Sequence, residues 1–298
     1  MRRARSICME PAGQRSSDKE HEPGAPFGRR TFMKRSAQGA LAAGVVYSAG
    51  DSQCLRVARE TLRVEGLAGE LAGFKIAFAA DFHRGVLVPA ETIRGAVDAI
   101  NREKPDVILL GGDFITESIQ YYESVLADLE RLSAAHGVYS VPGNHEYWTG
   151  VINYTRAIAG TSIKDLTNRG FEIGSRRRRL WIAGLDDNWC GGPDAAAAVA
   201  GAPPDAARVI FAHNPTVADE LPADYADLIL AGHTHGWQVY VPGVTRWFLP
   251  HESMRKYRAG YYRTKAGLVY VSSGVGVWHI PFRLWARPDV VTFTLVPA

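Results

Sequence analysis

Residues 75–83 read Lys-Ile-Ala-Phe-Ala-Ala-Asp-Phe-His, an apolar run that ends abruptly in an acid and an imidazole. The same arrangement returns four times along the chain, as a short β-type apolar run followed at once by polar residues. The five motifs are Asp81-Phe82-His83, Gly112-Asp113, Gly143-Asn144-His145-Glu146, His213-Asn214 and Gly232-His233-Thr234-His235. Because α/β sheets build their sites just beyond the carboxyl ends of strands, the five motifs predict one shared polar site.

The pattern around these motifs predicts an α/β layered fold in a single domain, residues 51–298. Strands are expected at Lys75–Ala80, Val107–Leu110, Gly137–Val141, Leu180–Leu185, Val209–Ala212, Leu228–Ala231, Leu268–Ser272 and Val290–Leu295. Helices are expected at Ala90–Glu103 and Glu123–Ala134. In the first helix Ile93, Val97 and Ile100 fall on one face, as in an amphipathic helix that packs on a sheet.

The distribution of charge argues against a nucleic-acid partner. The first 36 residues carry nine of the 34 basic side chains and four of the 31 acidic ones, so the rest of the chain carries 25 and 27. The body is therefore weakly acidic and offers no basic surface for phosphate backbones.

The run Arg176–Arg179 is interpreted as a solvated hairpin turn before the strand at Leu180. Three cysteines without a CxxC unit exclude a zinc finger, and pairing of Cys54 with Cys190 stays open.

Residues 1–50 are interpreted as a disordered N-terminus followed by an export signal or anchor. Residues 29–34 read Arg-Arg-Thr-Phe-Met-Lys, and a mildly apolar stretch at 37–49 follows that is too short to span a membrane. This arrangement resembles a Tat signal, which implies the Tat export machinery as a partner. The destination is then the periplasm or the outer face of the cytoplasmic membrane. No clean A-x-A cleavage site appears, so a leader that is retained as an anchor remains the alternative.

The residue types in the five motifs favour a metal centre. Carboxylates and imidazoles beside buried strands are costly unless they are paired or metal-bound. If the segment after residue 80 stays extended, Asp81 and His83 point the same way and can reach one ion. Mixed oxygen and imidazole ligands suit Zn, Mn or Fe, and a carboxylate has two oxygens with which to bridge two ions. A two-metal centre hydrolyses phosphate esters by activating a hydroxide. The flanking glycines allow tight turns and close approach to a ligand.

The order D-x-H, G-D, G-N-H-E, H and G-H-x-H resembles the signature of the calcineurin-like metallophosphoesterases over roughly residues 72–240. Residues 184–187, 212–215, 256–262, 270–276 and 281–283 resemble a bacterial subgroup that is often Tat-exported or membrane-associated. The resemblance implies two packed mixed β-sheets flanked by helices, and two divalent metal ions. It implies that the first ion is held by Asp81, His83 and His235, the second by Asn144, His213 and His233, and that Asp113 bridges them.

The resemblance also implies that His145 is no ligand but faces the substrate and assists the leaving group as catalytic residue. Glu146 is expected to orient His145 or a ligand. Two departures from the subgroup, Trp237 after Gly236 and Ala80 before Asp81, remove no ligand, although Trp237 would narrow the site or stack on a ring. A metal-stabilised scaffold without catalysis is the alternative, and it is disfavoured because every ligand position and His145 are kept.

The sequence leaves the substrate open between a phosphorylated small molecule and a phospholipid-type molecule. Aromatic residues crowd the C-terminal third, with arginines between them. They are interpreted as core residues or, alternatively, as a lipid-facing rim at a membrane surface. Some members of the resembling subgroup hydrolyse the pyrophosphate of UDP-2,3-diacylglucosamine, which is made in the cytoplasm. That alternative conflicts with export, so a general phosphodiesterase or phosphatase of the cell envelope is the expectation.

Overall fold

The computed structural model describes residues 33–34, 54–65, 67–174, 179–249 and 252–298, and within them the strands form two sheets of six. The first sheet has the order β1 (Arg56–Val64), β12 (Asp289–Pro297), β2 (Lys75–Ala79), β3 (Val107–Leu110), β4 (Val138–Ser140) and β5 (Lys164–Asp165). The second has the order β10 (Gly260–Thr264), β11 (Gly267–Val271), β9 (Leu228–Ala231), β8 (Ala207–Phe211), β7 (Leu180–Gly184) and β6 (Arg169–Ile173). Both sheets mix parallel and antiparallel pairs.

The two sheets pack face to face around one apolar core. Along β2, Ile76 and Phe78 point into this core, whereas Ala77 and Ala79 point to the opposite face, as the two-residue period of a strand requires. Both faces of β2, β3 and β9 are buried. This explains why these strands are continuous apolar runs and do not alternate with polar residues.

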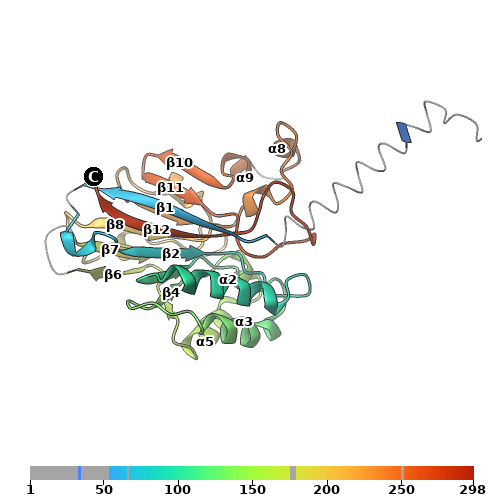
Figure 1. Ribbon diagram of the computed structural model, residues 1–298, viewed down its shortest axis with the longest axis horizontal. Coiled ribbons are helices and arrows are strands. Elements are labelled where there is room, and N and C mark those ends of the chain that lie inside the picture. The colour runs from blue at the N-terminus through green and yellow to red at the C-terminus, as the bar shows by residue number, and fades with distance from the viewer. Residues whose placement is uncertain (1–32, 35–53, 66, 175–178, 250–251) are drawn as a thin grey trace, which may run out of the picture. The chain divides into compact units, whose positions relative to one another are not determined.

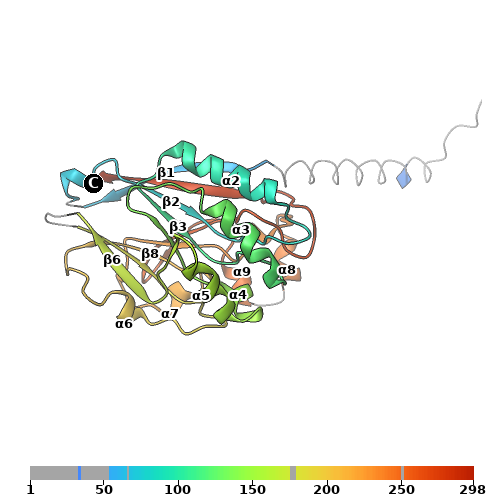
Figure 2. The same ribbon diagram turned by 90° about the horizontal axis from the view of Figure 1, so that it is seen from below.

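Helices cover the outer faces of both sheets. On the first sheet lie α2 (Ala90–Glu103), α3 (Tyr122–Leu129) and α5 (Val151–Ala159), which lie on the lower side in Figure 1 and face the viewer in Figure 2. On the second sheet lie the short helices α6 (Ala195–Ala198) and α7 (Val217–Glu220). The remaining helical segments are η1 (Gly69–Leu71), η2 (Ile119–Tyr121), α4 (Asn144–Trp148), η3 (His235–Trp237), α8 (Thr245–Phe248) and α9 (Glu252–Lys256). The predicted class, two packed mixed sheets flanked by helices, is confirmed.

The second predicted helix, Glu123–Ala134, was wrong at its end. Helix α3 ends at Leu129, and the chain then turns through residues 130–134. The side chain of Asn101 on α2 donates to the carbonyl of Arg131 at 2.8 Å and accepts from the amide of Ser133 at 3.0 Å. The Asn101 side chain therefore satisfies the backbone groups of Arg131 and Ser133 that would otherwise be paired within a longer helix. Helix α3 can end early without leaving these groups unpaired.

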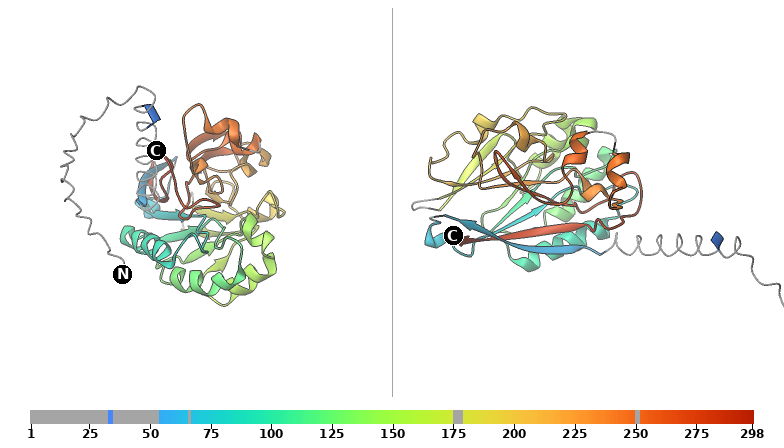
Figure 3. Two further views of the ribbon diagram at one scale, coloured as in Figure 1. Left: turned by 90° about the vertical axis from the view of Figure 1, so that its right-hand side faces the viewer. Right: turned by 90° about the horizontal axis from the view of Figure 1, so that it is seen from above.

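Strand β1 lies outside every predicted strand. It pairs in parallel with β12 over nine residues, from Arg56 opposite Asp289 to Val64 opposite Pro297. The first and last strands of the described body therefore lie side by side, as the blue and red strands in the right panel of Figure 3 show. Three of the nine β1 residues are buried, so its alternation is too weak to identify it locally.

Several predictions concern residues that the structure does not describe. The leader falls outside the described residues except at positions 33 and 34, and so do three arginines of the run Arg176–Arg179. Within the described ranges, no helix combines the length and the apolar character that crossing a bilayer demands. Cys54 and Cys190 are both free thiols, so the pairing that the sequence left open is not formed.

Candidate metal centre

The ends of five strands deliver the seven predicted ligands to one place, between the two sheets. From the first sheet, Asp81 and His83 follow β2, Asp113 follows β3, and Asn144 begins α4 after β4. From the second sheet, His213 follows β8, and the pair His233 and His235 follows β9. Six of the seven are buried, and His233 is half-buried. The predicted convergence at the strand ends is therefore confirmed.

Residues 81–83 are not extended, so the condition under which an alternating strand would bring Asp81 and His83 to one ion is not met. Asp81 and His83 have φ of 54° and 46°, in the left-handed region. Asp113, His233 and His235 lie there too, at 55°, 68° and 50°. A non-glycine residue in this region costs about 1–2 kcal/mol, and such strain gathers at functional sites where the surrounding structure enforces it. The chain therefore turns its ligands inward through strained single residues and not through the alternation of a strand.

Asp81, His83 and His235 form the first group of potential ligands. The Nε2 atoms of His83 and His235 face each other at 2.9 Å, and Oδ1 of Asp81 lies 3.9 Å from the first and 3.5 Å from the second. Both carboxylate oxygens of Asp81 also accept from the backbone amide of His233 at 3.0 Å, which ties the two sheets together. Two ring nitrogens at this separation share one proton or coordinate one cation, so the donor set fits a metal ion.

Asn144, His213 and His233 form a second group. Oδ1 of Asn144 lies 3.1 Å from Nε2 of His213, which in turn lies 3.1 Å from Nδ1 of His233. The other ring nitrogen of His213, Nδ1, contacts the carbonyl of Gly111 at 2.8 Å, and donation there leaves Nε2 free for a cation. Nε2 of His213 therefore lies within 3.1 Å of both other donor atoms.

Asp113 stands between the two groups. Its Oδ2 lies 3.4 Å from Nε2 of His83 in the first group and 3.1 Å from Nε2 of His213 in the second. Its Oδ1 accepts from the amide of His145 at 3.0 Å. The carboxylate therefore has the position that a bridging ligand needs.

The ionisable groups of the centre have strongly shifted pKa values, and together they favour a bound cation. Burial lowers the pKa of His83 and of His233 to about 3, so at neutral pH both rings are uncharged and offer lone pairs. Burial opposes the charge of His213 as well, yet the neighbouring Asp113 raises its pKa to about 10. Burial also raises the pKa of Asp81 to about 7, and the charge of Asp113 adds to that effect. A cation at this position would satisfy the carboxylates directly.

His145 lies in the first turn of α4, beside both groups. Its Nδ1 donates to the carbonyl of Thr116, which leaves Nε2 directed to the centre, 4.0 Å from Oδ2 of Asp113. Donor atoms of His83, Asp113 and His145 lie within 4.8 Å of one another, so His145 is close enough to act on a group bound at Asp113.

Glu146 orients a ligand segment and has no hydrogen bond to the His145 ring. Its buried carboxylate accepts from the amides of Asp113 at 2.8 Å, Phe114 at 3.0 Å and Gly143 at 2.8 Å. It thereby fastens the segment after β3 to the start of α4. Burial, and then Asp113, raise the pKa of Glu146 to about 8. Of the two roles expected from the sequence, orienting a ligand is the one that this geometry supports.

Arg283 is the buried residue whose role the sequence did not reveal. Its guanidinium is fully buried and donates to the carbonyls of His235 at 3.2 Å, Ala286 at 2.9 Å and Gly274 at 3.2 Å, and also to that of Gly276. It also lies 3.3 Å from Nδ1 of His235. Arg283 therefore fixes the backbone of a potential ligand from behind. The motif Pro281-Phe282-Arg283 was recognised in the sequence, but no neighbouring residue indicates that the arginine side chain is buried.

Two glycines permit the close approach that the sequence predicted. A Cβ on Gly143 would lie 2.3 Å from Oδ1 of Asp113, and one on Gly232 would lie 2.4 Å from Oδ2 of Asp81. Real carbon atoms do not approach so closely, so any side chain there would displace a carboxylate of the centre.

The centre opens into a cavity of about 720 Å³ with two unlike parts. We call its polar base the floor, which consists of His83, Asp113, Asn144, His145, His233 and His235. We call its apolar side the wall, which consists of Val239, Val241, Val244, Phe248, Leu249 and Met254. Trp237, the departure from the subgroup pattern, also lines the cavity, and its Nε1 donates to the carbonyls of Met254 and Tyr257 at 2.8 and 2.9 Å. Its indole thus holds α9 against the site.

Three tryptophans, Trp148, Trp189 and Trp278, form a rim around the floor. The ring of His145 lies 4.6 Å from that of Trp148 and 5.7 Å from that of Trp278, and Trp189 lies 5.4 Å from His233. Oδ2 of the buried Asp187 accepts from the amides of Trp189 and Cys190 at 3.1 and 2.8 Å, which holds the turn that presents Trp189. The rim makes the entrance to the floor aromatic.

Comparison with known proteins agrees with this geometry. Residues 74–237, which include all seven potential ligands, match the family described as calcineurin-like phosphoesterase. The chain belongs to this family. Membership makes it a metal-dependent phosphoester hydrolase, which is the enzyme class that the five motifs predicted.

Three similar proteins illustrate the breadth of the calcineurin-like phosphoesterase family around this chain. The phosphodiesterase YaeI of Escherichia coli is 34% identical, over 76% of this chain and 83% of its own length. The metallophosphoesterase YkuE of Bacillus subtilis is 28% identical, over 90% of this chain and 97% of its own length. A metallophosphoesterase of Helicobacter pylori is 29% identical over 75% of this chain, which spans only 60% of the length of that relative.

Proposed function

We propose that the protein hydrolyses phosphate monoester, diester or pyrophosphate bonds with two divalent metal ions in the floor. The observation that carries this proposal is the position of the Asp113 carboxylate, within 3.4 Å of Nε2 of His83 and 3.1 Å of Nε2 of His213. Asp81, His83 and His235 would hold one ion and Asn144, His213 and His233 the other, with Asp113 shared. Mn, Zn and Fe all suit this donor set. Bound there, two cations would polarise the phosphoryl oxygens and lower the pKa of the attacking water.

The residues of the chain supply orientation and a proton. Asp81 and Asp113 place carboxyl oxygens at fixed positions, and Glu146 and Arg283 fix the backbone of Asp113 and His235. Because Nδ1 of His145 donates to the Thr116 carbonyl, Nε2 is the atom that would protonate the leaving oxygen. General acid catalysis of this kind contributes roughly 10²–10⁴-fold. The tryptophan rim would exclude water from the far side of a bound ester.

The twin-arginine leader supports a place of action at the cell envelope. Export by Tat would carry the chain to the periplasm or to the outer face of the cytoplasmic membrane, with the leader cleaved or retained as an anchor. A phosphorylated small molecule or a phospholipid-type molecule would be the substrate there. UDP-2,3-diacylglucosamine, whose bond to be cleaved is a pyrophosphate, is the alternative substrate.

The proposed chemistry is tested with bis(p-nitrophenyl) phosphate and p-nitrophenyl phosphate. The purified full chain should cleave at least one of them with Mn²⁺, lose that turnover on chelation and regain it when Mn²⁺ is returned. The His145→Ala protein should bind Mn²⁺ as the wild type does and cleave these esters more slowly, but by a smaller factor than esters with alkoxide leaving groups, because p-nitrophenolate leaves without a proton. A folded protein that binds Mn²⁺ yet cleaves neither ester would favour the non-catalytic scaffold.

The proposed location is tested by changing the twin arginine alone. Replacing Arg29 and Arg30 together by lysine keeps the charge of the leader but removes the pair that a Tat signal requires. The chain should then accumulate in the cytoplasm, as cell fractionation and immunoblotting would show. Unchanged export would contradict the Tat assignment and leave the chemistry untouched.

A further inference from the structure

The cavity above the floor is much larger and more apolar than a phosphate group requires. Its volume of about 720 Å³ is within the range of pockets that bury a whole organic ligand. The six residues of the wall are aliphatic, aromatic or thioether side chains. Such a surface gains nothing from a polar ligand, but it is stabilised when an apolar group displaces its water. A phosphoester that carries only small or polar groups would occupy the floor and leave the apolar side chains of the wall in contact with water.

The wall belongs to a covering layer that hydrogen bonds hold in place over the cavity. The side chain of Gln238 donates to the carbonyls of Trp278 and Ile280 at 3.0 Å and accepts from the amide of Trp278 at 2.9 Å. The amide of Leu284 donates to the Gln238 carbonyl at 2.8 Å. The amide of Tyr240 also donates to the Leu284 carbonyl at 2.9 Å, so residues 238–240, which include Val239 of the wall, are joined to residues 278–284. At the other end of the segment, the guanidinium of Arg255 donates to the carbonyl of Leu249 at 3.0 and 2.8 Å. Both ends of the wall segment are therefore held in place without a ligand, as in most ligand pockets.

The far end of the wall is open to solvent at exposed apolar side chains. Phe248 is 80% exposed and Val244 is 47% exposed, although both line the cavity. Trp247, between them in sequence, is 78% exposed. Val244 and Phe248 therefore belong to the cavity lining and to the solvent-exposed surface at once, so the apolar lining reaches solvent. Arg246 lines a neighbouring pocket together with Trp237 and Trp247, where its charge would attract an anionic head group.

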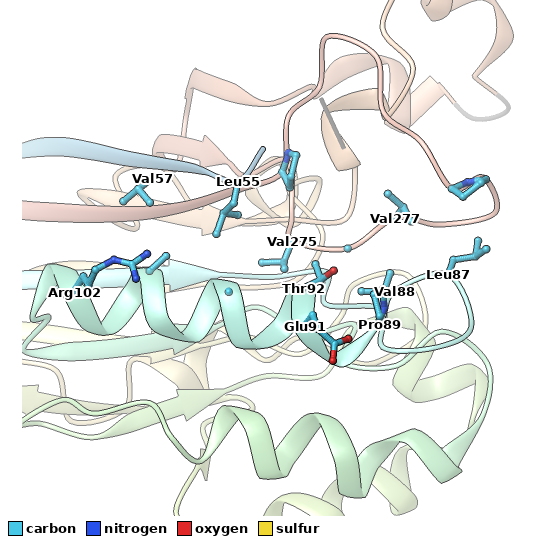
Figure 4. A pocket seen from close by; sticks show the side chains of 15 residues that line it. Leu55, Val57, Leu87, Val88, Pro89, Glu91, Thr92, Arg102, Val275 and Val277 are labelled. Carbon is cyan, nitrogen blue, oxygen red and sulfur yellow. The ribbon is translucent and has the colours of Figure 1, made fainter. Parts of the chain in front are cut away.

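A second cavity provides an internal comparison. It has a volume of about 590 Å³ and lies between the start of β1, α2 and residues 275–281, as Figure 4 shows with Leu55, Val275 and Val277 opposite Thr92. Its lining includes no histidine, aspartate or cysteine. Leu87, which lines it, is 40% exposed and so resembles Val244 in size and exposure. Substitutions at Leu87 therefore control for changes in a partly exposed apolar side chain away from the floor.

We infer that the wall binds a long apolar chain of the substrate, so that the natural substrate is a phosphoester of a lipid. The phosphoryl group would lie on the floor, the chain would run along the wall, and its end would leave at Val244 and Phe248. This inference rests on the proposed hydrolysis, because it assigns the part of the same substrate that does not react. The shared chemistry is a phosphoryl group joined to an alkyl, acyl or isoprenoid chain.

The inference is tested with two diesters that differ only in the chain, p-nitrophenyl methyl phosphate and p-nitrophenyl dodecyl phosphate. Both have the same leaving group, so the floor performs the same reaction on each. Below the micelle concentration of the dodecyl ester, its kcat/KM should exceed that of the methyl ester by about 10²-fold, the effect of withdrawing roughly four methylene groups from water.

Matched variants then locate the preference. Val244→Asp, which puts a charge in the apolar lining, should lower the ratio of the two kcat/KM values about tenfold or more, whereas Leu87→Asp should keep the wild-type ratio. Cleavage of both esters at equal kcat/KM, or a wild-type ratio in Val244→Asp, would overturn the lipid inference and leave the hydrolysis standing. Cleavage of neither ester by the Mn²⁺-loaded protein would overturn the proposed hydrolysis and the inference together.

Discussion

The floor and the wall of one cavity are built in opposite ways. Floor residues follow directly from core strands, are mostly buried, and are held by hydrogen bonds such as those from His233 to Asp81 and from Asp113 to Glu146. Wall residues come from residues 239–249 and from α9, and two of them are exposed by nearly half or more. The difference teaches that two properties are separable: the floor sets which bond is cleaved, and the wall sets which molecule carries that bond.

The largest effect should come from the centre of the floor. Asp113→Asn keeps the size of the side chain but removes the charge shared by both ligand groups. Turnover of every phosphoester should fall about 10⁴-fold or more, since metal catalysis contributes several kcal/mol. The methyl and dodecyl diesters should lose kcat/KM by the same factor. The measurement is kcat/KM on both p-nitrophenyl diesters, with thermal unfolding as the control for folding. A variant that retains a tenth of wild-type activity would contradict the shared role of Asp113.

Next in size is the loss of the proposed proton donor. His145→Ala should lower kcat about 10²–10⁴-fold on esters with alkoxide leaving groups, and less on p-nitrophenyl esters, whose leaving group needs no proton. Mn²⁺ content by elemental analysis should equal that of the wild type, because His145 is not proposed as a ligand. If the variant lost an ion, His145 would be a ligand together with His83 and Asp113.

A smaller loss is expected when the floor keeps its ligands but loses their support. Glu146→Gln has one carbonyl oxygen in place of the carboxylate that accepts from three backbone amides. Metal affinity should fall about 10–100-fold, the usual effect of changing a group that orients ligands. The measurement is the Mn²⁺ concentration at half-maximal activity, and saturating Mn²⁺ should restore most of the turnover. No change in that concentration would mean that Glu146 is not needed to place Asp113.

The smallest effect should come from the wall and should depend on the substrate. Phe248→Ala removes apolar contact at the far end of the cavity, so the ratio of kcat/KM for the dodecyl and methyl esters should fall about 3–10-fold. Leu87→Ala, in the second cavity, should leave the ratio unchanged. Equal losses on both esters would show that Phe248 supports the floor, and the separation of floor and wall would then fail.

The sequence predicted the metal centre well because strand ends and polar motifs are both local signals. Lys75–Ala80 and Leu228–Ala231 read as strands from their own residues, and Asp81 and His233 follow them directly. The left-handed turns at Asp81 and His83 were not predictable, because such conformations are enforced by neighbours such as the carbonyl of Gly112, which accepts from Asp81. The motifs could therefore say that these residues meet, but not how the backbone brings them together.

The wall, and several features elsewhere in the fold, escaped prediction because they depend on distant contacts. Arg283 reaches His235 over 48 residues, and β1 pairs with the opposite end of the chain. Trp247 and Phe248 were recognised as aromatic in sequence, but core and rim could not be told apart without their exposure. The end of α3 likewise depends on Asn101 from another helix. Local patterns cannot encode such partners.

The central claim is that the floor holds two cations and hydrolyses phosphoesters. The most direct test removes metal from the full chain with a chelator, then titrates the protein with Mn²⁺ while cleavage of bis(p-nitrophenyl) phosphate is followed. At protein concentrations well above the dissociation constants, activity should rise until two equivalents of Mn²⁺ per chain are bound and then remain constant. Saturation at a single equivalent would contradict the shared position of Asp113. Activity that survives chelation, or that never appears with Mn²⁺, Zn²⁺ or Fe²⁺, would contradict the claim as a whole.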